Sequence, residues 1–135
     1  MSIPVDLEQL RSTLTDRVRQ PYLLTTGADG RPHSVEVEWR WHDDELETPA
    51  GNRTLTNARA QELVALLWPP DDAGGYSLIV DGTVTHTEGT GTGDNGVRIR
   101  PTRAVLHRPA RPDNPATDTG CGADCVPLVQ AVPTT

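Results

Sequence analysis

Four segments between residues 21 and 108 decide the fold: PYLLTTGADGRPHSVEVEWRWHDDELETP (21–49), GNRTLTNARAQELVALLWPP (51–70), GGYSLIVDGTVTH (74–86) and VRIRPTRAVLHR (97–108). In much of their length apolar and polar side chains alternate, which is the period of a strand with one buried face. Ala28–Arg31 contains an Asp-Gly pair between two such runs, Tyr22–Thr26 and His33–Trp41. An Asp-Gly pair in this position predicts a β-hairpin, so a mainly β protein is expected.

The alternation within His33–Trp41 separates two faces. One face is apolar and the other polar: Val35, Val37, Trp39 and Trp41 against Ser34, Glu36, Glu38 and Arg40. The apolar face is expected in the core, and the polar face is expected to meet water, a pocket or a partner. A shift of one residue in the strand register would exchange the two faces.

The remaining pattern predicts two helices and four further strands. Helices are expected at 6–18, with Asp6 and Gln9 as a capping box, and at 52–63, with Asn52, Thr54 or Thr56 as N-cap. Strands are expected at 46–49, 64–68, 76–87 and 97–107. Asp81-Gly82 lies inside one of these strands, and by pattern alone it predicts a second hairpin turn.

In order and spacing these segments resemble the flavin-binding split-barrel family. That family includes pyridoxamine 5'-phosphate oxidase and the reductases that use the deazaflavin coenzyme F-420. The resemblance covers about two thirds of the chain and implies an antiparallel split β-barrel of six or seven strands with short helices. It also implies one bent strand through Gly82, since glycine serves at bulges, and a homodimer with two cofactor sites at the subunit interface.

The family's phosphate site lies on the third strand and the following helix, in a pattern close to Thr, then Gly-Ser-Arg-Lys, then Asn-Leu. Thr48 matches the threonine, Arg53 the arginine and Asn57 the asparagine, while Thr54 stands where the family has lysine. The resemblance implies that Arg53, Thr54 and Asn57 bind the cofactor phosphate and that Thr48 supports the ribityl chain. A hydroxyl at position 54 donates a hydrogen bond but brings no charge. The alternative for Arg53 and Asn57 is an ordinary solvated helical turn.

A second departure concerns the strand that lies along the flavin ring in the family. Family members often have Pro and Trp where this chain has Glu36 and Glu38, and two carboxylates repel an anionic cofactor. A one-residue shift of the alignment would instead place Trp39 beside the ring and return the acids to solvent. Trp39, Trp41 and Trp68 are candidates to stack on the ring; the alternatives are core packing and, at Trp68, a dimer contact.

Two functions follow as hypotheses. The first is an oxidoreductase that passes a hydride between reduced coenzyme F-420, or FMN, and a small conjugated acceptor. No catalytic acid or base is assigned, because such a protein mainly positions the ring against the acceptor. The second is a split barrel that has lost flavin binding and acts as a binding or regulatory module. The missing lysine, Glu36 and Glu38 motivate this alternative.

Histidine and cysteine offer weaker candidates. No metal site is assigned, because no pair among His33, His42, His86 and His107 has helical metal-ligand spacing. Some split-barrel relatives bind or degrade haem through a histidine, so a haem role stays open. Cys121 and Cys125 are the only thiols. They fit half of a zinc site, a disulfide, a redox pair or unreactive residues of the C-terminal tail.

Composition bounds the class of protein. A net charge of −7 without a basic stripe argues against nucleic acid as a partner, and the lack of lysine excludes Schiff-base chemistry. An apolar content of 35% without Phe favours a homodimer that buries further surface. With no apolar run of membrane-spanning length and no signal-peptide pattern at the start, a cytoplasmic protein without membrane contact and with a small-molecule substrate is expected.

The chain changes character after Arg108. Residues 1–108 are predicted to form the split-barrel domain, and residues 109–135, rich in Pro and Gly, to form a C-terminal tail without its own core. The tail is expected to dock on the barrel or on the partner subunit. Its apolar anchors would be Val126, Leu128, Val129 and Val132.

Overall fold

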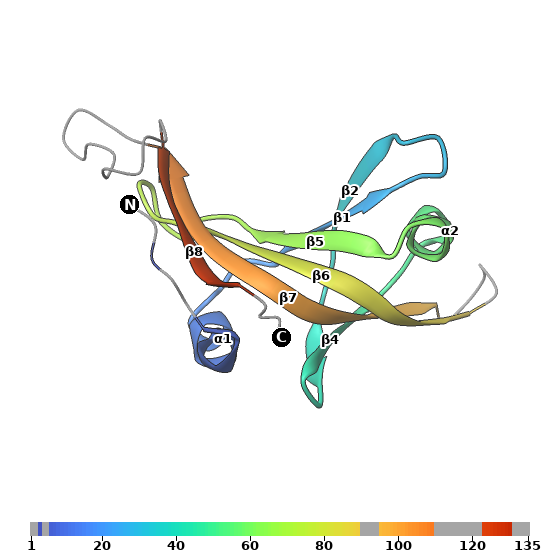
Figure 1. Cartoon of the computed structure of the whole chain (residues 1–135), viewed down its shortest axis with the longest axis horizontal. Helices are drawn as coiled ribbons and strands as arrows, with labels where there is room; N and C mark the ends of the chain where they lie inside the picture. The colour runs from blue at the N-terminus through green and yellow to red at the C-terminus, as the bar shows by residue number, and fades with distance from the viewer. Residues whose placement is uncertain (1–2, 4–5, 90–94, 110–122, 131–135) are drawn as a thin grey trace. The chain divides into compact units, whose positions relative to one another are not determined.

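The computed structural model describes Ile3, residues 6–89 and residues 95–109 with their side chains, and the backbone of residues 123–130 (Figure 1). The elements follow in the order α1 (Leu7–Thr15), β1 (Tyr22–Thr26), β2 (Pro32–Glu36), β3 (Arg40–His42), β4 (Glu45–Pro49), α2 (Asn52–Ala60), β5 (Leu63–Trp68), β6 (Ser77–Glu88), β7 (Gly96–Pro109) and β8 (Ala123–Gln130). Neither helix, at nine residues each, has the length and apolar character needed to cross a bilayer.

The strands pair in the order β2-β1-β5-β6-β7-β4-β3, and β8 pairs with β7. The pairs β1–β2, β1–β5, β3–β4, β4–β7 and β7–β8 are antiparallel. This confirms the predicted mainly antiparallel fold with short helices, and β8 adds a strand to the seven of the main path. Two compact units form, one from Gln20–Leu67 with Asp81–Pro101, the other from Met1–Arg19, Trp68–Val80 and Thr102–Thr135.

The predicted hairpin is present between β1 and β2. Gly30 has φ of +83°, in the left-handed region that favours glycine, and the Asp29 carboxylate accepts a hydrogen bond from the Arg31 backbone N at 3.0 Å. The single strand predicted at 33–41 is wrong. Its first part pairs with β1 and its last part, β3, pairs with β4, so the backbone leaves strand pairing between Glu36 and Arg40.

The predicted core face of that segment is also wrong. Residues 32–42 alternate between exposed and half-buried side chains, and none of them is fully buried. A segment that changes partner strands has a neighbour on only part of its length, so its apolar face stays partly accessible. This face belongs to the candidate site described below.

Helix α2 starts at Asn52 as predicted, but its N-cap and its last residue differ from those expected. Gly51 is the N-cap and Asn52 the first helical residue, while Thr54 lies buried in the first turn, so the predicted caps at Asn52, Thr54 or Thr56 are wrong. The helix ends at Ala60 rather than at Leu63, because Leu63 is already the first residue of β5. The buried face of α2 consists of Thr54, Leu55, Asn57 and Ala58.

Gly82 lies inside the continuous strand β6, as the family resemblance implied and against the hairpin turn that the pattern alone predicts. A Cβ atom at this position would lie 2.5 Å from Ile99 Cγ2 and 2.9 Å from the Arg100 carbonyl oxygen. The glycine therefore permits close approach of β7 to β6.

In the other unit, Leu10 and Leu14 of α1 are buried and the predicted capping box of Asp6 and Gln9 is present. The helix ends at Thr15, before Val18, which is 83% exposed. Past the helix end, the Arg17 guanidinium donates hydrogen bonds to the Pro69 and Tyr76 carbonyls. Burial lowers the pKa of Arg17, and nearby Asp71 opposes that shift.

Part of the predicted tail forms strand β8, whose backbone pairs with β7 so that Cys125 lies opposite His107. Cys121 and Val132 lie outside the described residues, and only backbone is described for Val126, Leu128 and Val129. The division into a barrel of residues 1–108 and a tail of 109–135 stays a prediction.

Candidate functional site

An open groove of about 1070 Å³ lies within the unit formed by residues 20–67 and 81–101. Its walls come from three stretches: His33 with residues 35–40, residues 47–54, and Glu88 with Asn95 and Gly96. Ligand sites in proteins commonly enclose about 300–1,000 Å³. The groove is therefore large enough for a cofactor of nucleotide size.

The N-terminus of α2 opens into this groove. Residues 51–54 line it, and no side chain among the described residues caps the helix at Gly51. The first helical hydrogen bond runs from the Leu55 N to the Gly51 carbonyl, at 2.9 Å, so the backbone N–H groups of residues 52–54 precede the helical ladder. Free N–H groups and the helix dipole favour an anion at this place.

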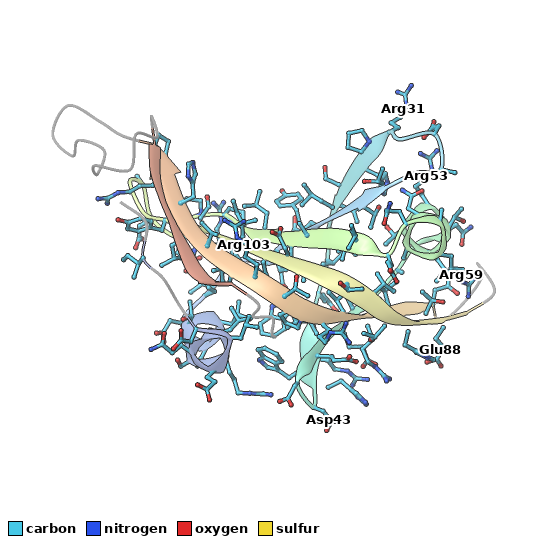
Figure 2. All side chains as sticks on the ribbon, in the orientation of Figure 1. Arg31, Asp43, Arg53, Arg59, Glu88 and Arg103 are labelled. Carbon is cyan, nitrogen blue, oxygen red and sulfur yellow. The ribbon has the colours of Figure 1, made fainter. Side chains whose placement is uncertain are left out.

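Arg53 adds a full positive charge to the same corner. Its side chain is exposed and lines the groove, and Figure 2 shows it beside α2, while Arg31 lies at the tip of the β1–β2 hairpin. A guanidinium next to a helix N-terminus is well suited to a phosphate, because it donates charge-assisted hydrogen bonds.

The structure brings together three of the four residues predicted to bind a cofactor. Thr48, Arg53 and Thr54 all line the groove. Thr48 and Thr54 are each 2% exposed, and the Thr48 hydroxyl donates to the Pro49 carbonyl oxygen at 3.0 Å. Both threonine side chains are therefore almost inaccessible, whereas Arg53 is exposed.

Asn57 is not part of the groove wall. It is 3% exposed, and its amide Nδ2 donates a hydrogen bond to Thr25 Oγ1 of β1 at 3.1 Å. Burying this pair of polar groups is tolerated because each satisfies the other. The contact fastens α2 to β1 and so fixes where the helix N-terminus points.

The segment between β2 and β3 contributes both acids and a tryptophan to the groove. Glu36 and Glu38 are exposed, and Trp39 is half-buried with its ring edge-on to Trp41, the centroids 5.8 Å apart and the planes at 82°. All of residues 35–40 border the groove, and within this stretch only residues 37–39 lie outside β2 and β3. The two alignments placed either the acids or Trp39 along the cofactor, whereas in the structure Glu36, Glu38 and Trp39 all line the groove. Water and salt screen the exposed carboxylates.

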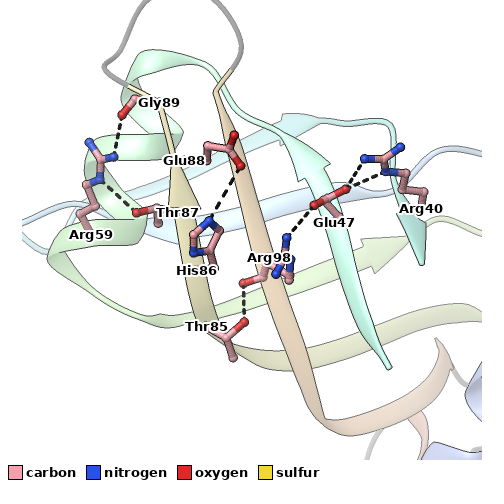
Figure 3. A network of polar contacts seen from close by, with 9 residues as sticks. All are labelled: Arg40, Glu47, Arg59, Thr85, His86, Thr87, Glu88, Gly89 and Arg98. Carbon is pink, nitrogen blue, oxygen red and sulfur yellow. Dashed lines mark hydrogen bonds and ion pairs between the residues drawn. The ribbon is translucent and has the colours of Figure 1, made fainter. Parts of the chain in front are cut away.

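A row of charged side chains crosses β3, β4 and β7 beside the groove (Figure 3). Glu47 lies opposite both Arg40 and Arg98 in the strand register. Its carboxylate accepts from Arg40 Nε at 2.7 Å and lies 3.3 Å from Arg98 Nη2. The hydrogen bond from Arg40 is the main cause that lowers the pKa of Glu47, and Arg98 contributes further.

Glu47 is therefore ionised at neutral pH and adds no net negative charge to the groove, since two guanidinium groups flank one carboxylate. Folding lowers the pKa of Glu47, so the ionised side chain stabilises the folded state at pH values above the ordinary pKa of a glutamate. This stabilisation is lost as the pH falls from that ordinary pKa through the lowered pKa of the folded state.

Arg59 holds the end of β6 against α2. Its Nη2 donates to the Gly89 carbonyl oxygen at 2.7 Å and its Nε to Thr87 Oγ1 at 3.1 Å (Figure 3). Glu88, between these two contacts, is one of the groove residues. The exposed Arg59 thus positions a wall of the groove without lining it.

His33 is one of the groove residues to which no role was assigned from the sequence. Its Nδ1 is buried and has no hydrogen-bond partner, and the side chain lines the groove. The strand alternation contained the signal, because His33 shares its parity with Val35 and Val37. His42 and His86 lie elsewhere in polar pairs, with Asp43 and Glu88 at 3.8 Å.

No family model matches the chain. Two mycobacterial proteins, the uncharacterized proteins Mb0449c of Mycobacterium bovis and MT0457 of Mycobacterium tuberculosis, are each 40% identical to it over 134 residues. The aligned region covers 90% of this chain and 93% of each relative.

Solved structures with the same fold have lower identity. An F420 reductase matches with a TM-score of 0.56 and 19% identity, over 69% of this chain and 94% of that protein. A Listeria innocua protein described as a putative pyridoxamine 5'-phosphate oxidase matches with a TM-score of 0.59 and 16% identity, over 74% and 96%. HutZ, the heme storage protein of Vibrio cholerae, matches with 0.56 and 13%, over 75% and 94%.

These structures confirm the predicted antiparallel split β-barrel. Identities of 13–19% establish a shared fold and no further property. The 40% identity to the mycobacterial proteins over nearly the whole chain establishes that they and this chain form one family. The chain thus belongs to the family of Mb0449c and MT0457, and its fold is the split barrel of the pyridoxamine 5'-phosphate oxidase-like proteins.

Proposed function

We propose that the protein is an oxidoreductase that binds coenzyme F-420, or else FMN, in the groove and passes a hydride between that cofactor and a small conjugated acceptor. One observation carries the proposal: the uncapped N-terminus of α2 and the exposed Arg53 open together into a groove of about 1070 Å³. The F420 reductase among the proteins of this fold supports the same reading.

The groove residues fit the phosphate end of either cofactor. Gly51 has no side chain, and a Cβ built there meets nothing within 4 Å, so an anion can approach the helix end. Arg53 would donate charge-assisted hydrogen bonds to the phosphate, and Thr54 would add a hydroxyl. Asn57 would act indirectly, by holding α2 on β1 through Thr25.

The cofactor, when bound, supplies the hydride-transfer chemistry. The chain contributes binding and orientation. Thr48, buried on β4 in the groove wall, would support the ribityl chain. Val35, Val37 and the half-buried Trp39 would cover the ring and keep water from it. No side chain is assigned as acid or base.

We also propose that the protein acts as a cytoplasmic homodimer on a small-molecule acceptor. The low apolar content of 35% without Phe supports the dimer, because a second subunit would bury further apolar surface. The net charge of −7 agrees with a partner other than nucleic acid.

The rim of the groove supports a second candidate, a split barrel that binds no flavin and serves as a binding or regulatory module. Glu36 and Glu38 line the groove with exposed side chains, and Thr54 stands where the family's phosphate site has lysine. Repulsion of a phosphate by these carboxylates would weaken flavin binding.

Thermal melting of the purified protein with FMN, coenzyme F-420 and haem, each added separately, distinguishes the two candidates. We expect F-420 or FMN to raise the melting temperature. A ligand at 100 times its dissociation constant adds about 2.7 kcal/mol to the free energy of unfolding. Unchanged melting with both cofactors at millimolar concentration would contradict the enzyme and favour the module, and a rise with haem alone would indicate a haem protein.

A further inference from the structure

Two tryptophans beside the groove form an aromatic pair. The ring centroids of Trp39 and Trp41 lie 5.8 Å apart, and the ring planes meet at 82°. Aromatic pairs favour this edge-to-face arrangement at centroid distances of about 4.5–7 Å. Trp39 lines the groove, whereas Trp41 does not. The contact therefore joins a groove residue to a neighbour outside the groove.

Trp41 is anchored by its strand. It lies on β3 and pairs directly with Leu46 of β4, which in turn pairs directly with Ile99 of β7. Side chains of directly paired residues project from the same face of a sheet. Leu46 and Ile99 are each 1% exposed, so this face is the core face. Trp41 stands at the edge of that core with a half-buried side chain.

Trp39 is not held by a strand. Residues 37–39 lie between β2 and β3, so strand pairing does not fix the direction of the Trp39 side chain. That side chain is half-buried and lines the groove, as do Val35 and Val37. The contact with the anchored Trp41 thus restrains an indole that keeps part of its surface accessible.

We propose that Trp41 is a positioning residue that holds the Trp39 indole in place to stack on the planar conjugated ring of the bound cofactor. This inference rests on the proposed function. An indole that is already held loses little conformational freedom when a ring binds to it, so the restraint favours binding. A pair kept only for packing would stabilise the fold and leave the affinity for the cofactor unchanged.

Two substitutions of Trp41 separate the ring contact from apolar bulk. Trp41→Leu keeps an apolar side chain without a ring, and Trp41→Phe keeps a ring that can meet Trp39 edge-on. The matched control is Tyr22→Leu, because Tyr22 is a partly exposed aromatic residue of the same unit that does not line the groove. If Trp41→Leu does not fold, the more adaptable Trp41→Met takes its place.

The proteins without ligand test the restraint itself. The chain has three tryptophans, so both Trp41 variants retain Trp39 and Trp68. Trp68 is 0% exposed, so it is held in the core in both. A difference in the decay of fluorescence anisotropy between the two variants therefore reports the motion of the Trp39 indole. We expect fast local motion in Trp41→Leu and little in Trp41→Phe, and equal motion in the two would overturn the inference.

Titration with FMN and coenzyme F-420 then measures the dissociation constants, together with melting of each protein without ligand. We expect Trp41→Leu to bind about 3- to 10-fold more weakly, the range for one aromatic contact. Trp41→Phe and Tyr22→Leu should bind nearly as tightly as the natural protein. Any loss of melting temperature should not follow the loss of affinity across the three variants.

Unchanged affinity of Trp41→Leu for the cofactor that the natural protein binds would overturn the role of Trp41 and leave the proposed function standing. Equal weakening in Trp41→Phe and Trp41→Leu would also overturn it, because lost bulk alone would then explain the effect. If the natural protein binds neither FMN nor F-420, the proposed function fails, and the inference fails with it.

Discussion

Replacing Arg53 with alanine is expected to weaken the binding of coenzyme F-420 or FMN by about 10- to 100-fold, the range for a lost hydrogen bond to a charged group. Arg53 lies at the uncapped start of α2 and lines the groove. Its side chain is exposed, so its removal should leave the melting temperature without ligand nearly unchanged. Titration of the two cofactors against the natural and substituted proteins measures the effect.

Arg31→Ala is the matched control for this experiment. Arg31 is an exposed arginine of the same unit, at the tip of the β1–β2 hairpin (Figure 2), and it does not line the groove. Both substitutions remove one positive charge from the molecule, so only a local contact distinguishes them. Equal losses of affinity in the two variants would contradict a phosphate site at Arg53.

The second large effect concerns stability. Trp68→Ala is expected to lower the free energy of unfolding by about 3–5 kcal/mol, the usual loss for a large aromatic side chain removed from a core. Trp68 ends β5 and is 0% exposed, so it is core rather than a side chain available to stack on a cofactor ring. Denaturant unfolding of the natural and substituted proteins measures the difference.

Trp39→Ala provides the comparison, because Trp39 is half-buried and lines the groove. Its removal takes less apolar area out of the core and is expected to cost less than half as much stability, while cofactor affinity falls. A loss of stability at Trp68 no larger than that at Trp39 would show that the burial of Trp68 is misassigned.

Much of the fold was predictable because strand periodicity and turn chemistry are local signals. The alternating runs around Ala28–Arg31 and the Asp-Gly pair predicted the β1–β2 hairpin, which is present. Alternation cannot show where a strand changes partner, so the break between Glu36 and Arg40 was missed. The continuous strand through Gly82 followed only from the family resemblance, because its reason is the distant Ile99 across the sheet.

The helix ends were predicted less well, since tertiary contacts decide them. Helix α1 stops at Thr15, and just beyond it Arg17 donates hydrogen bonds to the carbonyls of Pro69 and Tyr76, which lie more than fifty residues away. Helix α2 stops at Ala60 because β5 has already begun at Leu63. Neither the distant carbonyls nor the strand pairing of β5 is visible in the local pattern.

Three of the four motif residues lie together in the structure, and their role in binding a cofactor stays a prediction. Thr48, Arg53 and Thr54 share the groove, as the spacing of the family pattern implied. The burial of Asn57 against Thr25 depends on how α2 packs on β1. The pairing of Glu47 with both Arg40 and Arg98 depends on the register of three strands, which local alternation does not show. His33 was given no role from the sequence, although it shares its place in the strand alternation with Val35 and Val37.

A crystal structure of the protein with coenzyme F-420 or FMN bound tests the central claim most directly. We predict that the cofactor phosphate accepts hydrogen bonds from backbone N–H groups of residues 52–54 and from the Arg53 guanidinium, with the ring along residues 35–39. A cofactor bound with its phosphate away from the start of α2 would contradict the account.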